Sequence, residues 1–197
     1  MKRYPHTTKI QLVVMLAIAA LAGRTTLADP TNSESTAAGT APVKAKAMAS
    51  TIFEEKWDGI ASVAWLPKAP STEVDKGIHV AKITTSKAGE SNVVQVVLLP
   101  RTFAGKWVTV TTRVKGDKVS TRPNPYNGPK VGFHFKNAEG VDSYPQSDAL
   151  PDGTFDWMDV KWRVLVPSNV ASGEFGIGLE NVQGTLLVAP ISITAAD

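Results

Sequence analysis

The feature that most constrains this chain is an alternation of apolar and polar residues with a period of two. It begins at Ser50 and continues almost to the C-terminus, and apolar stripes with helical spacing are absent from this part of the sequence. Such alternation is typical of strands that have one buried and one exposed face. Turn-forming runs, for example Pro151-Asp152-Gly153, separate the apolar segments. We therefore expect an all-β domain.

The pattern predicts nine short strands. They are expected at Ser50–Glu54, Ala61–Leu66, Gly77–Thr84, Asn92–Leu99, Trp107–Val114, Lys130–Lys136, Met158–Val166, Glu174–Glu180 and Gly184–Thr194. Strands of this length and spacing are typical of an antiparallel β-sandwich or jelly roll. The sequence contains no cysteine, so a core rather than disulfides must stabilise the domain, and thiolate chemistry is excluded.

The alternation also predicts which face of each strand is buried. Along Trp107–Val114, three valines and Thr112 share one face, whereas Trp107 and Arg113 lie on the other with two threonines. Along Lys130–Lys136, Phe133 points to the apolar side and His134 to the polar side. Each strand thus contributes one core face and one polar face.

The first 28 residues have the pattern of an export signal. Three basic residues precede an apolar run at 10–22, and Ala28 ends a candidate cleavage site. The apolar run is short for a membrane span, so we interpret 1–28 as a signal peptide. An uncleaved anchor is the alternative. We expect a secreted or periplasmic protein that has no membrane contact after cleavage.

Residues 29–49 are predicted to form a flexible linker before the domain at 50–197. Ala, Ser, Thr and Pro dominate this stretch and aromatic residues are absent, so it has little apolar surface to bury. The alternative is an N-terminal arm packed on the domain.

The formal net charge is +3 for the whole chain but becomes slightly negative when the predicted signal peptide is left out. Residues 1–28 contain four Lys or Arg and no Asp or Glu, which leaves 17 basic and 18 acidic residues in the remainder. A nucleic-acid-binding protein needs a concentrated basic face, and the balanced charge gives no support for one. We expect no nucleic-acid partner.

Three segments in the second half have an informative order and spacing. They are VKGDKVSTRPNPYNGPKVGFHFKNAEGVDSYPQ at 114–146, GTFDWMDVKWRVLVP at 153–167 and GEFGIGLENVQGTLLVAPISI at 173–193. Together they resemble galactose-binding-like jelly-roll domains of the carbohydrate-binding-module type, which accompany bacterial cellulases and other glycoside hydrolases. The resemblance covers roughly residues 50–197. It implies a non-catalytic module that binds a polysaccharide or glycan.

The resemblance also implies a structural calcium, held by acids near the first strand and an acid on the last strand. Glu54 and Glu55 are present, but the last strand has Leu187-Val188-Ala189-Pro190 at the corresponding place. Calcium takes six to eight oxygen ligands, several of them charged. The sequence therefore disfavours the calcium site, and we predict no cofactor or metal.

Sugar sites combine aromatic rings, which stack on a pyranose, with polar side chains that bind its hydroxyls. Aromatic residues on predicted loops or polar faces are therefore candidates, together with neighbouring polar residues. The predicted carbohydrate-binding residues are Trp107, Tyr126, Tyr144 and Gln146, with His134 and Arg113 as polar contacts.

Catalytic patterns are poor, so we predict that the protein is not an enzyme. Glu174 and Glu180 lie six residues apart on one strand, about 20 Å by strand rise, which is too far for a glycosidase pair. A small jelly-roll polysaccharide lyase that uses His134 with Tyr126 or Tyr144 is a minor alternative, although the Gln-x-His signature of such lyases is missing. The main alternative is a structural or protein-interaction domain of the cell envelope that has lost sugar binding and could have an envelope protein as its partner.

Overall fold

Two antiparallel sheets make up the domain. The computed structural model describes residues 49–59, 65–98 and 102–196, which belong to one compact unit. These described ranges contain eleven strands and no α-helix, in agreement with the all-β prediction. No helix in them is long and apolar enough to cross a membrane. The predicted signal peptide and all but the last residue of the predicted linker lie outside the described residues.

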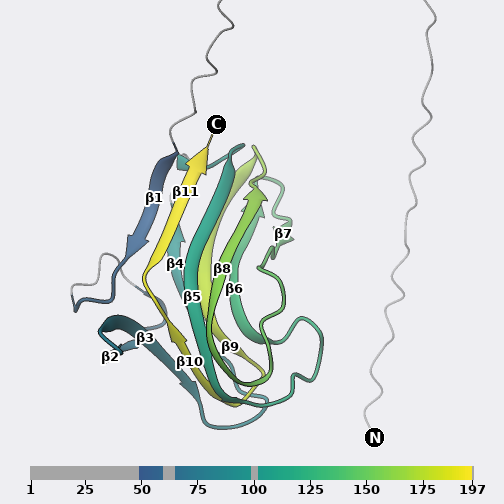
Figure 1. The fold of residues 1–197 in the computed structure, drawn as a ribbon. Helices are drawn as coiled ribbons and strands as arrows, with labels where there is room; N and C mark the ends of the chain where they lie inside the picture. Colours follow the sequence, from purple (N-terminus) through teal and green to yellow (C-terminus); the bar gives the residue numbers. More distant parts are fainter. Residues whose placement is uncertain (1–48, 60–64, 99–101, 197) are drawn as a thin grey trace, which may run out of the picture. The chain divides into compact units, whose positions relative to one another are not determined.

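The larger sheet has seven strands arranged around the long strand β5 (Figure 1). Its members are β1 (Ser50–Glu55), β2 (Ser71–Asp75), β3 (Ile78–Thr85), β5 (Trp107–Val119), β8 (Gly153–Leu165), β10 (Gly184–Val188) and β11 (Ile191–Ala196). One edge of β5 pairs first with β11 and then with β10, and the other edge pairs with β8. Strand β1 follows β11, and β3 and β2 follow β10.

The smaller sheet has four strands in the order β4–β9–β6–β7. They are β4 (Asn92–Leu98), β6 (Gly128–Asn137), β7 (Asp142–Ser143) and β9 (Val170–Glu180). The chain after β7 continues along β6. The N–H of Phe133 donates to the carbonyl of Pro145 at 2.8 Å, and the N–H of Ser147 donates to the carbonyl of Val131 at 2.9 Å. These bonds fix the intervening loop at the edge of the small sheet.

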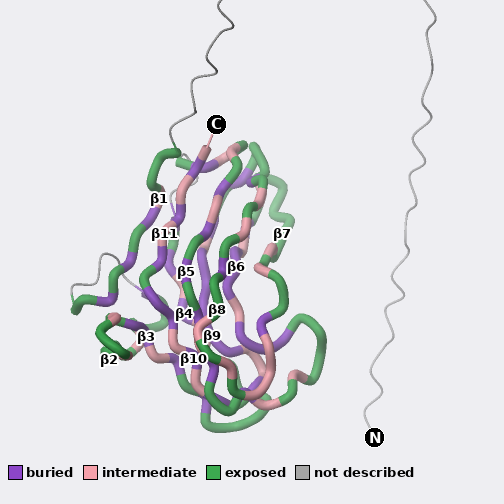
Figure 2. Tube along the Cα trace, in the orientation of Figure 1, coloured by how far each residue is buried: buried purple, intermediate pink, exposed green. Residues whose placement is uncertain are grey.

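The core lies between the two sheets and is rich in aromatic rings. Phe175 from β9 contacts Phe53 from β1, and Phe133 from β6 contacts Trp162 from β8, so rings from both sheets meet. The predicted buried faces are confirmed: Val108, Val110 and Val114 on β5 and the phenylalanines of β6 are buried. Figure 2 shows buried and exposed positions alternating along the strands.

The strand predictions differ from the structure in several places. The short strand β7 was not predicted, and β9 begins at Val170 and not at Glu174. Strand β2 was missed because Val74 is its only large apolar residue and lies exposed at the sheet edge. The predicted last strand is divided into β10 and β11 at Ala189-Pro190, where proline has no N–H for the ladder. Strands β5 and β8 are longer than expected. Most of the strand predicted at 61–66 lies outside the described residues.

Candidate functional site

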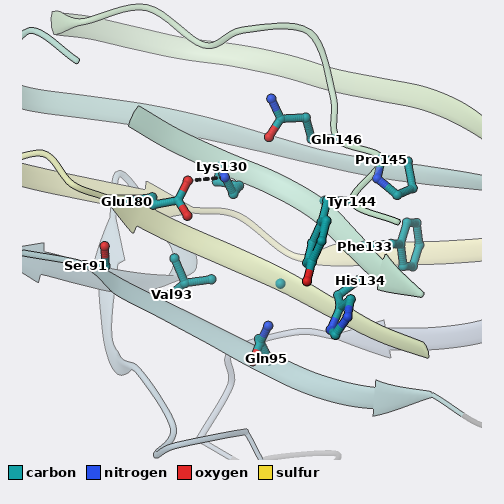
Figure 3. A pocket seen from close by; sticks show the side chains of 12 residues that line it. Ser91, Val93, Gln95, Lys130, Phe133, His134, Tyr144, Pro145, Gln146 and Glu180 are labelled. Carbon is teal, nitrogen blue, oxygen red and sulfur yellow. Dashed lines mark hydrogen bonds and ion pairs between the residues drawn. The ribbon is translucent and has the colours of Figure 1, made fainter. Parts of the chain in front are cut away.

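A hollow of about 280 Å³ lies on the outer face of the four-stranded sheet (Figure 3). Its floor is a row of four residues that are neighbours across successive strands. Gln95 of β4 pairs with Gly176 of β9, which pairs with Gly132 of β6, which bridges to Gln146 in the loop. The two central residues have no side chain, whereas an amide stands at each end. We call this hollow the groove.

An ion pair bounds the groove at one end. The Lys130 ammonium on β6 contacts the Glu180 carboxylate on β9, and the side-chain amide of Asn127 lies 3.4 Å from the same carboxylate oxygen. Asn127 is buried at the turn before β6. The amide and the ammonium together orient the carboxylate, and the ammonium balances its charge.

Tyr144 and His134 bound the other end. Their rings stack with centroids 4.6 Å apart and planes 9° from parallel, and Figure 3 shows both rings at this end of the groove. His134 Nε2 lies 2.8 Å from Asp142, and Nδ1 lies 3.4 Å from Glu174. The hydrogen bond from His134 lowers the pKa of Asp142, so this carboxylate stays ionised to lower pH than usual. The tyrosine ring therefore rests on a histidine that is fixed on both sides.

This geometry suits a ligand with many hydroxyl groups. The glutamines can each donate and accept hydrogen bonds, and the Tyr144 side chain is 68% exposed. Lys130 and Glu180, which both line the groove, are paired with each other. Lys130 and His134 are four residues apart on one strand, which sets a length of roughly 13 Å. The groove thus offers an aromatic face, neutral amides and compensated charges over a short span.

The structure brings together three of the six predicted site residues. Tyr144, Gln146 and His134 all line the groove. Tyr126 is 62% exposed in the turn before β6 and does not line it. Trp107 and Arg113 lie on β5, on the outer face of the other sheet. The residues predicted as one site therefore lie on two opposite surfaces of the domain.

Four contributors to the groove were missed at the sequence level. Gln95 is the polar residue inside the apolar run VVQVV, and this interruption was the available signal. Nothing comparable in the sequence pointed to Lys130. The two floor glycines also gave no such signal, because a glycine in a strand usually indicates a bulge or a close approach of another segment. Their role depends on the pairing of β4, β9 and β6.

Comparisons with known proteins give similar structures but no similar sequence. No protein-family model matches the chain, and no curated protein matches it by sequence. The structure resembles the CBM22-1 xylan-binding domain of Paenibacillus barcinonensis Xyn10C, with TM-score 0.52, 13% identity, and coverage of 78% of this chain and 99% of that domain. It also resembles the C-terminal family 22 carbohydrate-binding module of Clostridium thermocellum Xyn10B, with TM-score 0.51, 13% identity, and coverage of 74% and 94%.

The chain has the jelly-roll fold of carbohydrate-binding modules. At this identity the likeness shows the fold alone. The predicted fold class, an antiparallel jelly-roll sandwich of the galactose-binding-like kind found in such modules, is confirmed.

The calcium site that the resemblance implies does not fit the residues of this jelly roll. The buried Glu55 carboxylate accepts hydrogen bonds from the backbone N–H groups of Lys56 and Trp57 and from the indole of Trp65, at 3.0, 3.2 and 3.1 Å. The Ala189 carbonyl accepts from the Trp57 indole and the Thr112 hydroxyl, both at 3.0 Å. The Glu55 carboxylate and the Ala189 carbonyl, which a calcium ion would need as ligands, therefore already accept hydrogen bonds from N–H and O–H groups. Within the described ranges, no group of three or more His, Asp or Glu could hold a metal.

We expect calcium to leave the stability of the protein unchanged. A ligand that binds only the folded state at 100 times its Kd adds about 2.7 kcal/mol. The Tm measured with millimolar CaCl₂ should equal the Tm with EDTA, because this corner of the jelly roll is held by indole and backbone donors. A saturable rise of Tm with calcium would contradict this, and MgCl₂ is the control for ionic strength.

Proposed function

We propose that the groove binds a segment of a polysaccharide, and that the protein is an exported, non-catalytic carbohydrate-binding module. The observation that carries the proposal is the glycine floor between two glutamines, with the Tyr144 ring at one end. A sugar ring over Gly176 meets no side chain beneath it. Gly132 lets the Pro145-Gln146 segment approach closely, since a Cβ there would lie 3.0 Å from the Pro145 carbonyl oxygen and 3.1 Å from the Gln146 Cβ. Its hydroxyls reach both amides, and its apolar face reaches the tyrosine. The xylan- and carbohydrate-binding modules that share the fold add support.

Two arrangements support a non-catalytic role. Each ring nitrogen of His134 already faces a carboxylate oxygen, of Asp142 or of Glu174, so neither is placed to take a proton from a sugar carbon. The Glu180 carboxylate is already engaged by the Lys130 ammonium and the Asn127 amide. Among the described residues that line the groove, no free acid–base pair lies at its centre.

Truncating the groove tyrosine tests the proposal. In native affinity electrophoresis on a panel of soluble plant, algal and bacterial polysaccharides, the wild-type protein should be retarded by at least one neutral polymer. Tyr144→Ala should weaken that binding by about 2 kcal/mol, or roughly thirtyfold in Kd, since exposed aromatic platforms dominate such contacts.

Tyr126→Ala is the matched control, because Tyr126 is similarly exposed but lies outside the groove. It should retain wild-type binding. Equal losses in the two variants would contradict the assignment of the groove. Unchanged mobility of the folded wild-type protein on every polymer would contradict sugar binding altogether and favour a protein partner in the cell envelope.

A further inference from the structure

The outer face of the seven-stranded sheet presents a second row of exposed side chains, contributed by β5 and β8. Cross-strand pairing places Thr109 opposite Arg163, Thr111 opposite Lys161, and Arg113 opposite Asp159. Trp107 and Leu165 end the row and form another such pair. We call this two-strand surface the β5–β8 strip. It faces away from the groove, which lies on the other sheet.

The β5–β8 strip has uncompensated positive charge, unlike the groove. Arg113 is paired with Asp159 at 3.3 Å. Lys161 and Arg163 have no carboxylate partner among the residues that the structure describes. They are two residues apart on one strand, so both point outward with Cα atoms roughly 6.7 Å apart. An anionic chain that follows the strand could meet both cations.

The shape of the strip also suits a ligand. The guanidinium of Arg163 lies 4.5 Å from the ring centroid of Trp107, which holds an indole that is still 40% exposed. A hollow of about 460 Å³ lies beside Thr111, Arg113 and Lys161. The strip therefore combines an aromatic ring, threonine hydroxyls, free cations and a concave surface.

We propose that the β5–β8 strip is a second binding site, specific for a polysaccharide whose sugars carry carboxylates. Guanidinium and ammonium groups bind carboxylates through charge-assisted hydrogen bonds, and the threonines and Trp107 provide contacts for the sugar rings. The groove suits acidic sugars less, because its Lys130 ammonium is already paired with Glu180 and its His134 lies between the carboxylates of Asp142 and Glu174. The two faces of the sandwich would then recognise polymers of different charge. This inference does not depend on sugar binding in the groove.

The main competing explanation is that Lys161 and Arg163 only protect a sheet edge. Within the described residues β8 pairs with β5 alone, and charges on an edge strand prevent pairing with another sheet. Edge protection accounts for the two cations. It does not account for an exposed tryptophan beneath one of them or for the adjacent hollow.

Charge reversal in the strip provides the test. We would measure retardation of the protein by polygalacturonate in native affinity gels, at low salt and at 300 mM NaCl, relative to gels without polymer. The double variant K161E/R163E should bind at least tenfold more weakly than wild type. The control K56E/K68E makes the same charge change at two exposed lysines outside the strip and the groove, and should bind within twofold of wild type.

Three results would overturn the proposal. They are no retardation of the wild-type protein by polygalacturonate, equal weakening in the two double variants, and loss of binding in a variant that fills the groove, such as Gly176→Val. The last result would indicate that the acidic polymer binds in the groove and not on the β5–β8 strip. Association of K161E/R163E into oligomers without any loss of binding would instead support edge protection. Failure of neutral polysaccharide binding would leave this test unaffected, because it uses a different polymer.

Discussion

A Gly176→Val variant should lose binding to the neutral polysaccharide while it remains folded. A Cβ atom added to Gly176 would lie 3.4 Å from side-chain carbons of Gln95 and Val93, which is ordinary van der Waals contact. Valine is also favoured in strands. Its methyl groups would project from the floor of the groove into the space proposed for a sugar ring. We expect Kd to rise by roughly thirtyfold or more, equivalent to about 2 kcal/mol.

Affinity electrophoresis measures the loss of binding, and a thermal melt of the same sample shows whether the variant remains folded. Ser192→Val places the same side chain on the outer face of the opposite sheet and should change neither binding nor Tm by much. Gly176→Ala should give an intermediate affinity, because one methyl fills less of the groove. Wild-type affinity in a folded Gly176→Val protein would show that the ligand does not lie over the glycine floor.

Gly178→Ala should strongly destabilise the fold, although it lies only two residues away on the same strand. Its Cβ would be 2.1 Å from the backbone oxygen of Asn92 and 2.7 Å from the Cα of Val93, and its φ is +153°. Neither neighbour is a side chain that can rotate away, so β9 and β4 would have to separate. Overpacking and backbone strain together should cost about 3 kcal/mol or more.

Such a loss lowers Tm by on the order of 10 °C for a domain of this size. The measurement is thermal or urea unfolding followed by tryptophan fluorescence. Gly176→Ala is the matched control, because it is the same substitution on the same strand but its added Cβ makes only ordinary van der Waals contacts. It should remain near wild-type stability. A Gly178→Ala protein as stable as the control would show that β4 and β9 are less closely paired than the structure indicates.

Much of the fold followed from local pattern because side chains alternate faces along a strand. The valines of β5 and the phenylalanines of β6 were assigned to the core correctly, and Trp107, Arg113 and His134 to polar faces. The exposed edge strand β2 and the break at Pro190 were not predicted. An edge strand buries little, so its sequence carries little apolar signal.

The site was only partly predictable because its parts come from strands far apart in the sequence. Tyr144 and Gln146 lie two residues apart, so local reasoning placed them together, and His134 was predicted separately on a polar strand face. Gln95 joins them only through the row across β4, β9 and β6. Trp107 looked equivalent to Tyr144 because both are aromatic residues at exposed positions.

The sequence by itself determined the period of two, the turns and the buried face of most strands, since these depend on residues a few positions apart. It could not determine to which sheet each polar face belongs, because strand pairing is decided by contacts between distant segments. The tertiary structure therefore decided that Trp107 and Arg113 lie on the face opposite Tyr144. It also decided that two glycines, Gly132 and Gly176, become adjacent and leave a hollow that neither forms alone.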